Sequence, residues 1–237
     1  MCSKYQSKEF YLTYLIQLSR LLIFLMPLIY TSDLITVGKL GVWKVEEDDA
    51  FFHNRLHVTD TEQNELDHLG IRKRKEWFSS RYLLHLLSER EIRGACLKDE
   101  FGKPYLENSD HYISISHSAD YTAVIASTSV VGIDIQRIVA KIERIAPKFI
   151  SDDEAINIKD LSRIECMHTI WGAKESMYKA YGKKELDFKK HLFVLPFEYD
   201  ANGFVFEGIV KKDDFLEKYT LFCHTINDLI LVYAIQQ

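Results

Sequence analysis

The pattern of apolar and polar positions predicts a first group of strands and helices between residues 40 and 127. Alternation at residues 40–45 predicts a strand, and acidic, helical segments follow over residues 48–69. A long helix is predicted for residues 72–89, where apolar side chains recur at helical spacing. The Gly-Pro turn FGKPYL at residues 101–106 leads into an extended segment, and β-rich segments at 112–116 and 122–127 follow.

A second group of predicted strands and helices, between residues 130 and 237, repeats this order. A strand is predicted at residues 130–135, and Ser151 and Glu154 have the spacing of a helix capping box. A second long helix covers residues 163–181 and ends at Gly182, after which three apolar segments predict antiparallel strands. We therefore predict an α+β fold of two similar halves, residues 26–129 and 130–237, with the seam near residues 128–131.

The N-terminal segment needs a separate interpretation. Residues 11–30 are largely apolar, but Gln17 and Arg20 interrupt them, and the clean run 21–30 is too short for a ~30 Å hydrocarbon core, which needs ~20 residues. No small-residue cleavage site follows. We hypothesise that the native chain starts at Met26 and that residues 1–25 are an extension, which the intact mass of the native protein would test. A membrane-tethered interaction protein anchored by residues 1–25 is the alternative.

The composition and the net charge of the chain argue against some classes of function. Apolar residues make up 47% of the chain and charged residues 27%, as in an ordinary soluble protein. A formal charge of -5 argues against a general nucleic-acid binder. The four cysteines, Cys2, Cys96, Cys166 and Cys223, lack zinc-ligand spacing, so we expect reduced thiols and a cytoplasmic location.

Two short clusters carry polar residues beside predicted strands. In ISISHSAD (113–120), Ser116 and His117 stand at a strand end, where a histidine is either a solvated turn residue or a donor to a phosphate. In VGIDIQRI (131–138), Asp134 lies on the strand face opposite Ile133 and Ile135. An aspartate in an apolar strand needs compensation for its desolvation, so it either caps a turn or binds a cation.

The third cluster is WGAKESMYKAYGKK (171–184). Trp171, Glu175 and Lys179 share one helix face. Taken alone, Glu175 and Lys179 suit an ordinary surface ion pair worth ~0.2–0.5 kcal/mol, and Lys174 is expected to be solvated.

In combination, SHS at 116–118, GIDI at 132–135 and W-x-x-K-E-x-x-x-K at 171–179, with FGKPYL before them, form a long-range signature. It resembles the 4′-phosphopantetheinyl transferase superfamily, in its larger two-half (Sfp-type) branch, from Gly41 to the C-terminus. The resemblance implies halves related by pseudo-twofold symmetry that hold coenzyme A in the cleft between them. It further implies transfer of the 4′-phosphopantetheine arm to a serine of an apo acyl or peptidyl carrier protein, with release of 3′,5′-ADP. One chain, a monomer, suffices for one such site.

The resemblance also implies roles for individual residues. Asp134 and Glu175 would hold Mg²⁺ at the pyrophosphate of coenzyme A, in keeping with the preference of this ion for oxygen ligands. Lys179 would bind phosphate and stabilise or protonate the leaving group, and Glu175 would accept the serine proton. Ser116 and His117 would contact the coenzyme's phosphates.

Coenzyme-binding residues are also implied outside these clusters. Arg72, Arg74 and Lys75 belong to a basic run that matches the region gripping the 3′-phosphate, although such a run can equally be a solvated helix face. Lys103 and Pro104 match the segment beside the adenine. The carrier protein could serve fatty acid, polyketide or peptide synthesis.

One position departs from many relatives, which carry an acid where this chain has Gln136. Glutamine could bind Mg²⁺ only through a neutral carbonyl oxygen, so we predict weaker metal affinity with activity retained. A Mg²⁺ titration of Gln136→Glu should show a lower half-saturating concentration; an unchanged one would contradict the prediction. Gln136 also favours the alternative of a non-catalytic relative that binds coenzyme A or a carrier protein.

Overall fold

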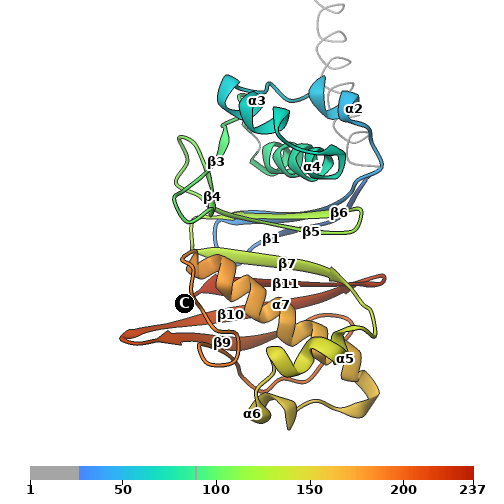
Figure 1. Ribbon diagram of the computed structural model, residues 1–237, viewed down its shortest axis with the longest axis vertical. Coiled ribbons are helices and arrows are strands. Elements are labelled where there is room, and N and C mark those ends of the chain that lie inside the picture. The colour runs from blue at the N-terminus through green and yellow to red at the C-terminus, as the bar shows by residue number, and fades with distance from the viewer. Residues whose placement is uncertain (1–26, 89) are drawn as a thin grey trace, which may run out of the picture.

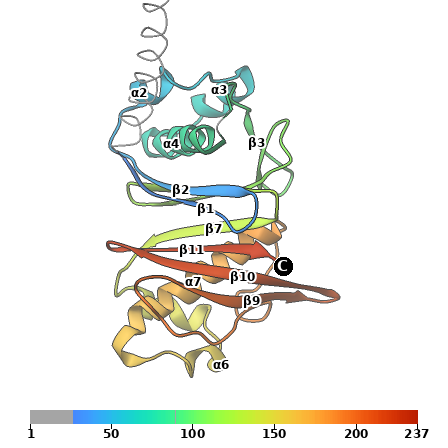
Figure 2. The ribbon, with the colours of Figure 1, turned by 180° about the vertical axis from the view of Figure 1, so that it is seen from behind.

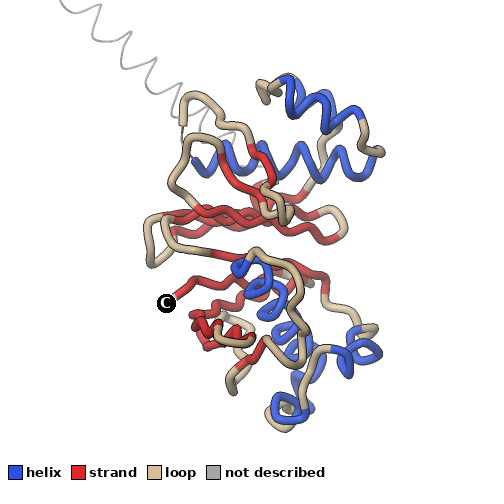
Figure 3. The backbone as a smooth tube through the Cα atoms, turned by 60° about the vertical axis from the view of Figure 1, so that its left-hand side comes forward, coloured by secondary structure: helices blue, strands red, loops and turns tan. Residues whose placement is uncertain are grey.

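The computed structural model describes residues 27–88 and 90–237, and it contains two antiparallel sheets stacked face to face. The strand order is β1-β2-β6-β5-β4-β3 in the first sheet and β7-β11-β10-β9-β8 in the second. Helices cover the outer face of each sheet (Figure 1; Figure 3). The predicted α+β fold with two halves is confirmed. The segment 1–25 and the proposed start at Met26 lie outside the described residues.

The elements follow the chain in two groups. The first contains β1 (Leu28–Asp33), β2 (Gly38–Lys44), α2 (Asp49–His53), α3 (Asp60–Asp67), α4 (Ile71–Ser88), β3 (Cys96–Lys98), β4 (Pro104–Leu106), β5 (Tyr112–Ser118) and β6 (Tyr121–Ser127). The second contains β7 (Val131–Arg137), α5 (Ile142–Ile145), α6 (Asp152–Ala155), α7 (Arg163–Tyr181), β8 (Leu192–Val194), β9 (Phe204–Lys212), β10 (Phe215–Ile226) and β11 (Leu229–Gln236). The chain passes from the first sheet to the second between Ser127 and Val131.

The two halves share one connectivity. Apart from β1, each sheet pairs its first strand with its last and then runs backwards through the remaining strands, β2-β6-β5-β4-β3 and β7-β11-β10-β9-β8. In the chain, the long helix α4 comes between β2 and β3, and the long helix α7 comes between β7 and β8. Each long helix packs on the outer face of its sheet (Figure 2). This repeated topology underlies the predicted pseudo-twofold relation.

Apolar side chains form one core between the sheets and one beneath each long helix. The central core joins Leu40 and Ile125 of the first sheet to Ile133, Ile135 and Leu231 of the second. The outer cores pack α4 against the first sheet and α7 against the second. Because alternate residues of a strand face opposite sides, burying Ile133 and Ile135 between the sheets turns Asp134 toward α7.

Local signals placed most of the elements. The capping box of Ser151 and Glu154 begins α6 as predicted, and Gly182 ends α7 in a left-handed conformation with φ 73°. The sequence analysis missed β1, β3 and β8. Strands β3 and β8 have only three residues each, too few to show alternation, and β1 begins within the apolar run that ends at Tyr30.

Serine hydroxyls join the halves along the free edge of β7. The backbone N–H groups of Ile133, Ile135 and Arg137 donate to the hydroxyls of Ser114, Ser116 and Ser118 at 3.1, 3.2 and 3.1 Å. Each contact joins residues 19 positions apart, so β5 and β7 run side by side in the same direction. These bonds satisfy edge donors that would otherwise remain unpaired at the interface between the halves.

Gly132 allows α7 to lie close to β7. A Cβ at this position would stand 1.9 Å from the carbonyl oxygen of Ser176 and 2.8 Å from the backbone nitrogen of Ala180. Gly132→Ala should therefore push α7 outward and cost about 3 kcal/mol of unfolding free energy, the upper end of ordinary overpacking. Chemical denaturation would measure the loss. Gly70→Ala is the matched control, since nothing lies within 4 Å of a Cβ there, and an equal cost at both positions would contradict the prediction.

Two further findings bear on the sequence predictions. Within residues 27–88 and 90–237, no helix is long and apolar enough to cross a membrane. Cys96, Cys166 and Cys223 are buried free thiols, as expected.

Candidate active site

Asp134 and Lys179 form the centre of a polar cluster between β7 and α7. The Lys179 ammonium donates to Asp134 Oδ1 at 2.8 Å, to the carbonyl of Ile133 at 2.9 Å and to Ser116 Oγ at 3.0 Å. The Ser116 hydroxyl donates to the same Asp134 oxygen at 2.9 Å. Asp134 is only 7% exposed, so these donors compensate the desolvation of its carboxylate.

Glu175 lies one helical turn before Lys179 and is half-buried. Burial, and after it the nearby charge of Asp134, raise the pKa of Glu175, while Lys179 opposes the rise. The surface ion pair between Glu175 and Lys179 does not form, because the ammonium is directed to Asp134 instead. Among the described residues, nothing donates a hydrogen bond to the Glu175 carboxylate. The carboxylates of Asp134 and Glu175 thus lie near one another, and the Lys179 ammonium lies beside Asp134 between β7 and α7.

Gln136 joins Asp134 to His168 by hydrogen bonds. Its amide nitrogen donates to Asp134 Oδ2 at 3.3 Å and to the carbonyl of His168 at 3.0 Å. Its carbonyl oxygen lies 2.6 Å from His168 Nδ1. Metal ligation by the Gln136 carbonyl would therefore require the amide to leave His168.

The structure corrects the prediction for Lys174, whose side chain was expected to be solvated. It is fully buried, and its ammonium donates to the carbonyls of Phe149 and Phe188 and to the Glu154 carboxylate. Burial lowers the pKa of Lys174, and Glu154 opposes this shift. The residue next to Glu175 thus anchors α7 to two loops rather than facing solvent.

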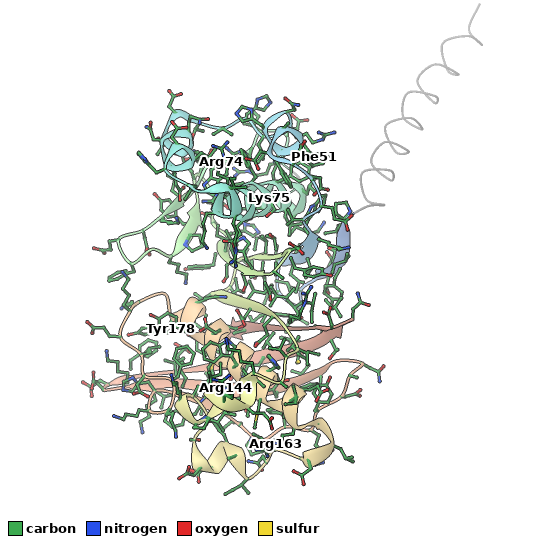
Figure 4. The ribbon with its side chains drawn as sticks, turned by 45° about the vertical axis from the view of Figure 1, so that its right-hand side comes forward. Phe51, Arg74, Lys75, Arg144, Arg163 and Tyr178 are labelled. Carbon is green, nitrogen blue, oxygen red and sulfur yellow. The ribbon has the colours of Figure 1, made fainter. Side chains whose placement is uncertain are left out.

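A groove between the halves leads to this cluster. A cavity of about 350 Å³ is lined by Lys103 and Pro104 of the first half and by Tyr178, Lys179 and Lys184 of the second. Figure 4 shows Tyr178 on α7, beside the first half. A second cavity of about 250 Å³ shares Pro104 and Ile115 with the first, and its other lining residues include Lys73, Glu76, Arg81, Lys98 and His117. The two cavities adjoin, and lysines line both.

His117 points to the opposite face of β5 from Ser116. Its Nε2 lies 2.9 Å from the backbone carbonyl of Glu76 and must donate, because a carbonyl only accepts. Burial lowers the pKa of His117 to about 4, so at neutral pH Nδ1 is an acceptor. The expected donation to a phosphate would require protonation at Nδ1, which an adjacent anion favours.

The remaining predicted residues are dispersed. Arg72 and Lys75 line a separate cavity of about 360 Å³ beside Tyr121. Arg74 pairs with Asp49 at 3.0 Å and lies away from the groove (Figure 4). Lys103 donates to the carbonyl of Ala180 at 2.7 Å and so connects the halves at the wall of the first cavity.

The segment of the chain that carries this cluster is similar in sequence to known proteins. A sequence model of the 4′-phosphopantetheinyl transferase superfamily matches residues 130–228, the segment that carries Asp134, Gln136, Glu175 and Lys179. The chain is 31% identical over 141 residues to the 4′-phosphopantetheinyl transferase gsp of Aneurinibacillus migulanus. This match covers 58% of the chain and 56% of the relative, so it spans about half the length of that protein. In this segment the chain is similar to the 4′-phosphopantetheinyl transferase superfamily. The resemblance stated from the motifs is confirmed.

The oxygen donors of the cluster between β7 and α7 fit a divalent cation. Asp134 and Glu175 offer hard carboxylate oxygens, and the Lys179 ammonium on Asp134 occupies the place of a cation. Across residues 27–88 and 90–237 no group of three or more His, Cys, Asp or Glu side chains could hold a metal. A cation here would thus have two protein carboxylates, which matches the usual mode of Mg²⁺, completed by water and substrate phosphates.

Some residues at or near the candidate site were not predicted from the sequence. The alternation of Ser114, Ser116 and Ser118 was visible in the sequence, but only the stacking of the sheets gives these hydroxyls acceptor roles at β7. Lys73 belongs to the same basic run as Lys75, and within that run it is Lys73 that lines the second cavity together with His117. His168 had no local signal, because it follows an ordinary helical pattern.

Proposed function

We propose that this protein transfers the 4′-phosphopantetheine arm of coenzyme A to a serine of an apo acyl or peptidyl carrier protein, with Mg²⁺, and releases 3′,5′-ADP. One observation carries the proposal. The motif residues Asp134, Glu175 and Lys179 meet Ser116 of the other half at a groove built by both halves. This arrangement supports a site for a large, phosphate-rich substrate.

Bound Mg²⁺ would neutralise charge on the pyrophosphate, and Asp134 and Glu175 are the residues that would hold it. Glu175 also suits proton acceptance from the carrier serine, because none of the described residues donates a hydrogen bond to its carboxylate, whose oxygens stay available to an incoming hydroxyl. Lys179 suits stabilisation of the departing phosphate, since its ammonium is already held at the wall of the groove. Transfer joins the serine oxygen to the β-phosphorus, and the bond from that phosphorus to the 3′,5′-ADP oxygen breaks.

The second cavity suits the other phosphate of coenzyme A. Lys73, Lys98 and Arg81 line it together with His117, and Pro104 connects it to the first cavity. Glu65 and Glu76 line it as well and pair with these three cations, so a phosphate would have to take the place of the carboxylates. We assign Lys103 and Pro104 to the adenine side, with Arg72 and Lys75 as an outer basic contact. Arg74 is the weakest of the predicted ligands, because it pairs with Asp49 and lines neither cavity of the groove nor the cavity of Arg72 and Lys75.

The test is a transfer assay read by mass. The protein is incubated with an apo acyl carrier protein, coenzyme A and Mg²⁺, and the carrier is weighed with and without coenzyme A. We expect the carrier to gain the phosphopantetheine mass only in the complete mixture. If several carriers of fatty acid, polyketide and peptide synthesis remain unmodified while coenzyme A binds, the non-catalytic alternative holds, which the neutral Gln136 favours. We further propose that a cytoplasmic monomer carries out the reaction.

Lys179 should compete with the metal in the absence of coenzyme A, since it occupies Asp134. Lys179→Met is therefore expected to bind Mn²⁺ about tenfold more tightly without coenzyme A, as a charge-assisted hydrogen bond no longer has to be broken. Transfer should nevertheless fall about a hundredfold. Calorimetry and the mass assay measure the two effects. Lys183→Met, at the wall of the same cavity, is the control, and equal metal affinity in both variants would refute the competition.

A further inference from the structure

His168 belongs to a buried network behind the Asp134 carboxylate. The residue is 2% exposed and lies on α7 two turns before Glu175. Its Nδ1 contacts the Gln136 carbonyl oxygen at 2.6 Å, and the backbone N–H of Val139 donates to its Nε2 at 3.0 Å. The chain of contacts Val139–His168–Gln136–Asp134 leads directly to the proposed cation site.

The contacts determine the orientation of the Gln136 amide. One end of the amide faces Asp134 Oδ2 and the His168 carbonyl, two atoms that only accept, so this end must be the NH₂ group. The other end is then the carbonyl oxygen, and His168 Nδ1 must carry the proton that it accepts. With Nδ1 protonated, Nε2 of the neutral ring accepts from the Val139 N–H at 3.0 Å, and the Val139 carbonyl, 3.1 Å from the same nitrogen, receives no proton from it.

Close packing leaves the amide little room to turn. Gly172 lies one turn after His168, and a Cβ there would stand 3.1 Å from Gln136 Nε2 and 2.9 Å from a methyl carbon of Val232. The absence of a side chain lets α7 approach β7 at this point. Rotation of the amide would break its bond with His168 and place its oxygen against the Asp134 carboxylate.

We propose that His168 is a positioning residue for the metal site: it fixes Gln136 as a hydrogen-bond donor that orients the Asp134 carboxylate, and thereby keeps Gln136 from acting as a ligand. The inference rests on the proposed function. Lys179 and Ser116 hold one oxygen of Asp134, and Gln136 holds the other. The plane of the carboxylate is thus defined before a cation arrives, which is how outer-shell partners tune metal ligands.

Two substitutions of similar polarity separate this role from general packing. In His168→Asn, the side-chain N–H₂ stands near the position of Nδ1 and can still donate to Gln136. In His168→Gln, the corresponding group stands near Nε2 and cannot. The readout is the dissociation constant of Mn²⁺ in the presence of coenzyme A, measured from the electron paramagnetic resonance signal of free Mn²⁺. We expect His168→Asn to bind within about twofold of the wild type and His168→Gln about tenfold more weakly, the lower end of outer-shell effects.

A second comparison uses the Gln136→Ala background. Since His168 acts only through Gln136, His168→Gln should cause no further weakening there. An equal weakening in both backgrounds, or equal affinities of the Asn and Gln variants, would overturn the positioning role. Absence of Mn²⁺ binding by the wild type, with coenzyme A bound, would instead contradict the proposed function.

Discussion

Asp134→Asn is expected to lower phosphopantetheine transfer about 100- to 1,000-fold while the protein remains folded. The substitution keeps the size of the side chain and removes the charge that faces Lys179 and would face the cation. Losses of this size are typical when one preorganised electrostatic group is removed from an active site. Rates of carrier modification, read by mass at saturating coenzyme A, give the effect.

The control for this variant is Asp110→Asn, an equal change at an exposed aspartate of the β4–β5 loop. We expect it to leave transfer unchanged. Thermal unfolding of both variants separates a lost function from a lost fold. A fully active, folded Asp134→Asn protein would show that the cluster at β7 and α7 is not the catalytic centre.

Lys174→Met is expected to have the largest effect on stability, a loss of about 3–5 kcal/mol of unfolding free energy. The ammonium donates three hydrogen bonds of 2.7 to 2.8 Å, which use all its protons. Its removal leaves the buried Glu154 carboxylate without a counter-charge, and the buried Phe149 carbonyl and the partly buried Phe188 carbonyl without this donor. Urea denaturation measures the loss.

Adding Glu154→Gln to this variant should recover part of the stability, because the uncompensated buried charge disappears. The recovery is partial because an amide has one oxygen, which accepts from either Ser151 or Val194, whereas the carboxylate accepts from both. The matched control is Lys159→Met, which removes an equivalent ion pair from the surface with Glu198; no measurable change is expected. If the two single variants lose the same stability, burial is not what makes the Lys174 contact important.

The same helix thus serves the fold and the site at neighbouring positions. Lys174 attaches α7 to the segments around Phe149 and Phe188, while Glu175 lies toward Asp134. Gly132 lets α7 lie against β7 closely enough for Lys179 to contact Asp134. A change that loosens α7 should therefore reduce stability and activity together.

The sequence by itself determined the order of the main elements and the resemblance to a known superfamily. Alternation in β7 placed Asp134 opposite Ile133 and Ile135, and the capping box and Gly182 marked helix ends. These features are local, since period and caps depend on neighbours within a few residues. The motifs at 116–118, 132–135 and 171–179 were sufficient to indicate the superfamily.

Only the tertiary structure decided which partner each charge takes. Lys179 binds Asp134, 45 positions away, rather than Glu175 on its own helix, and Lys174 binds Glu154 in the interior rather than water. Likewise, Gln136 turns its carbonyl to His168, 32 positions away. The free energy of a charge or an amide depends on the distant groups that folding places around it, and no local pattern of residues encodes those groups.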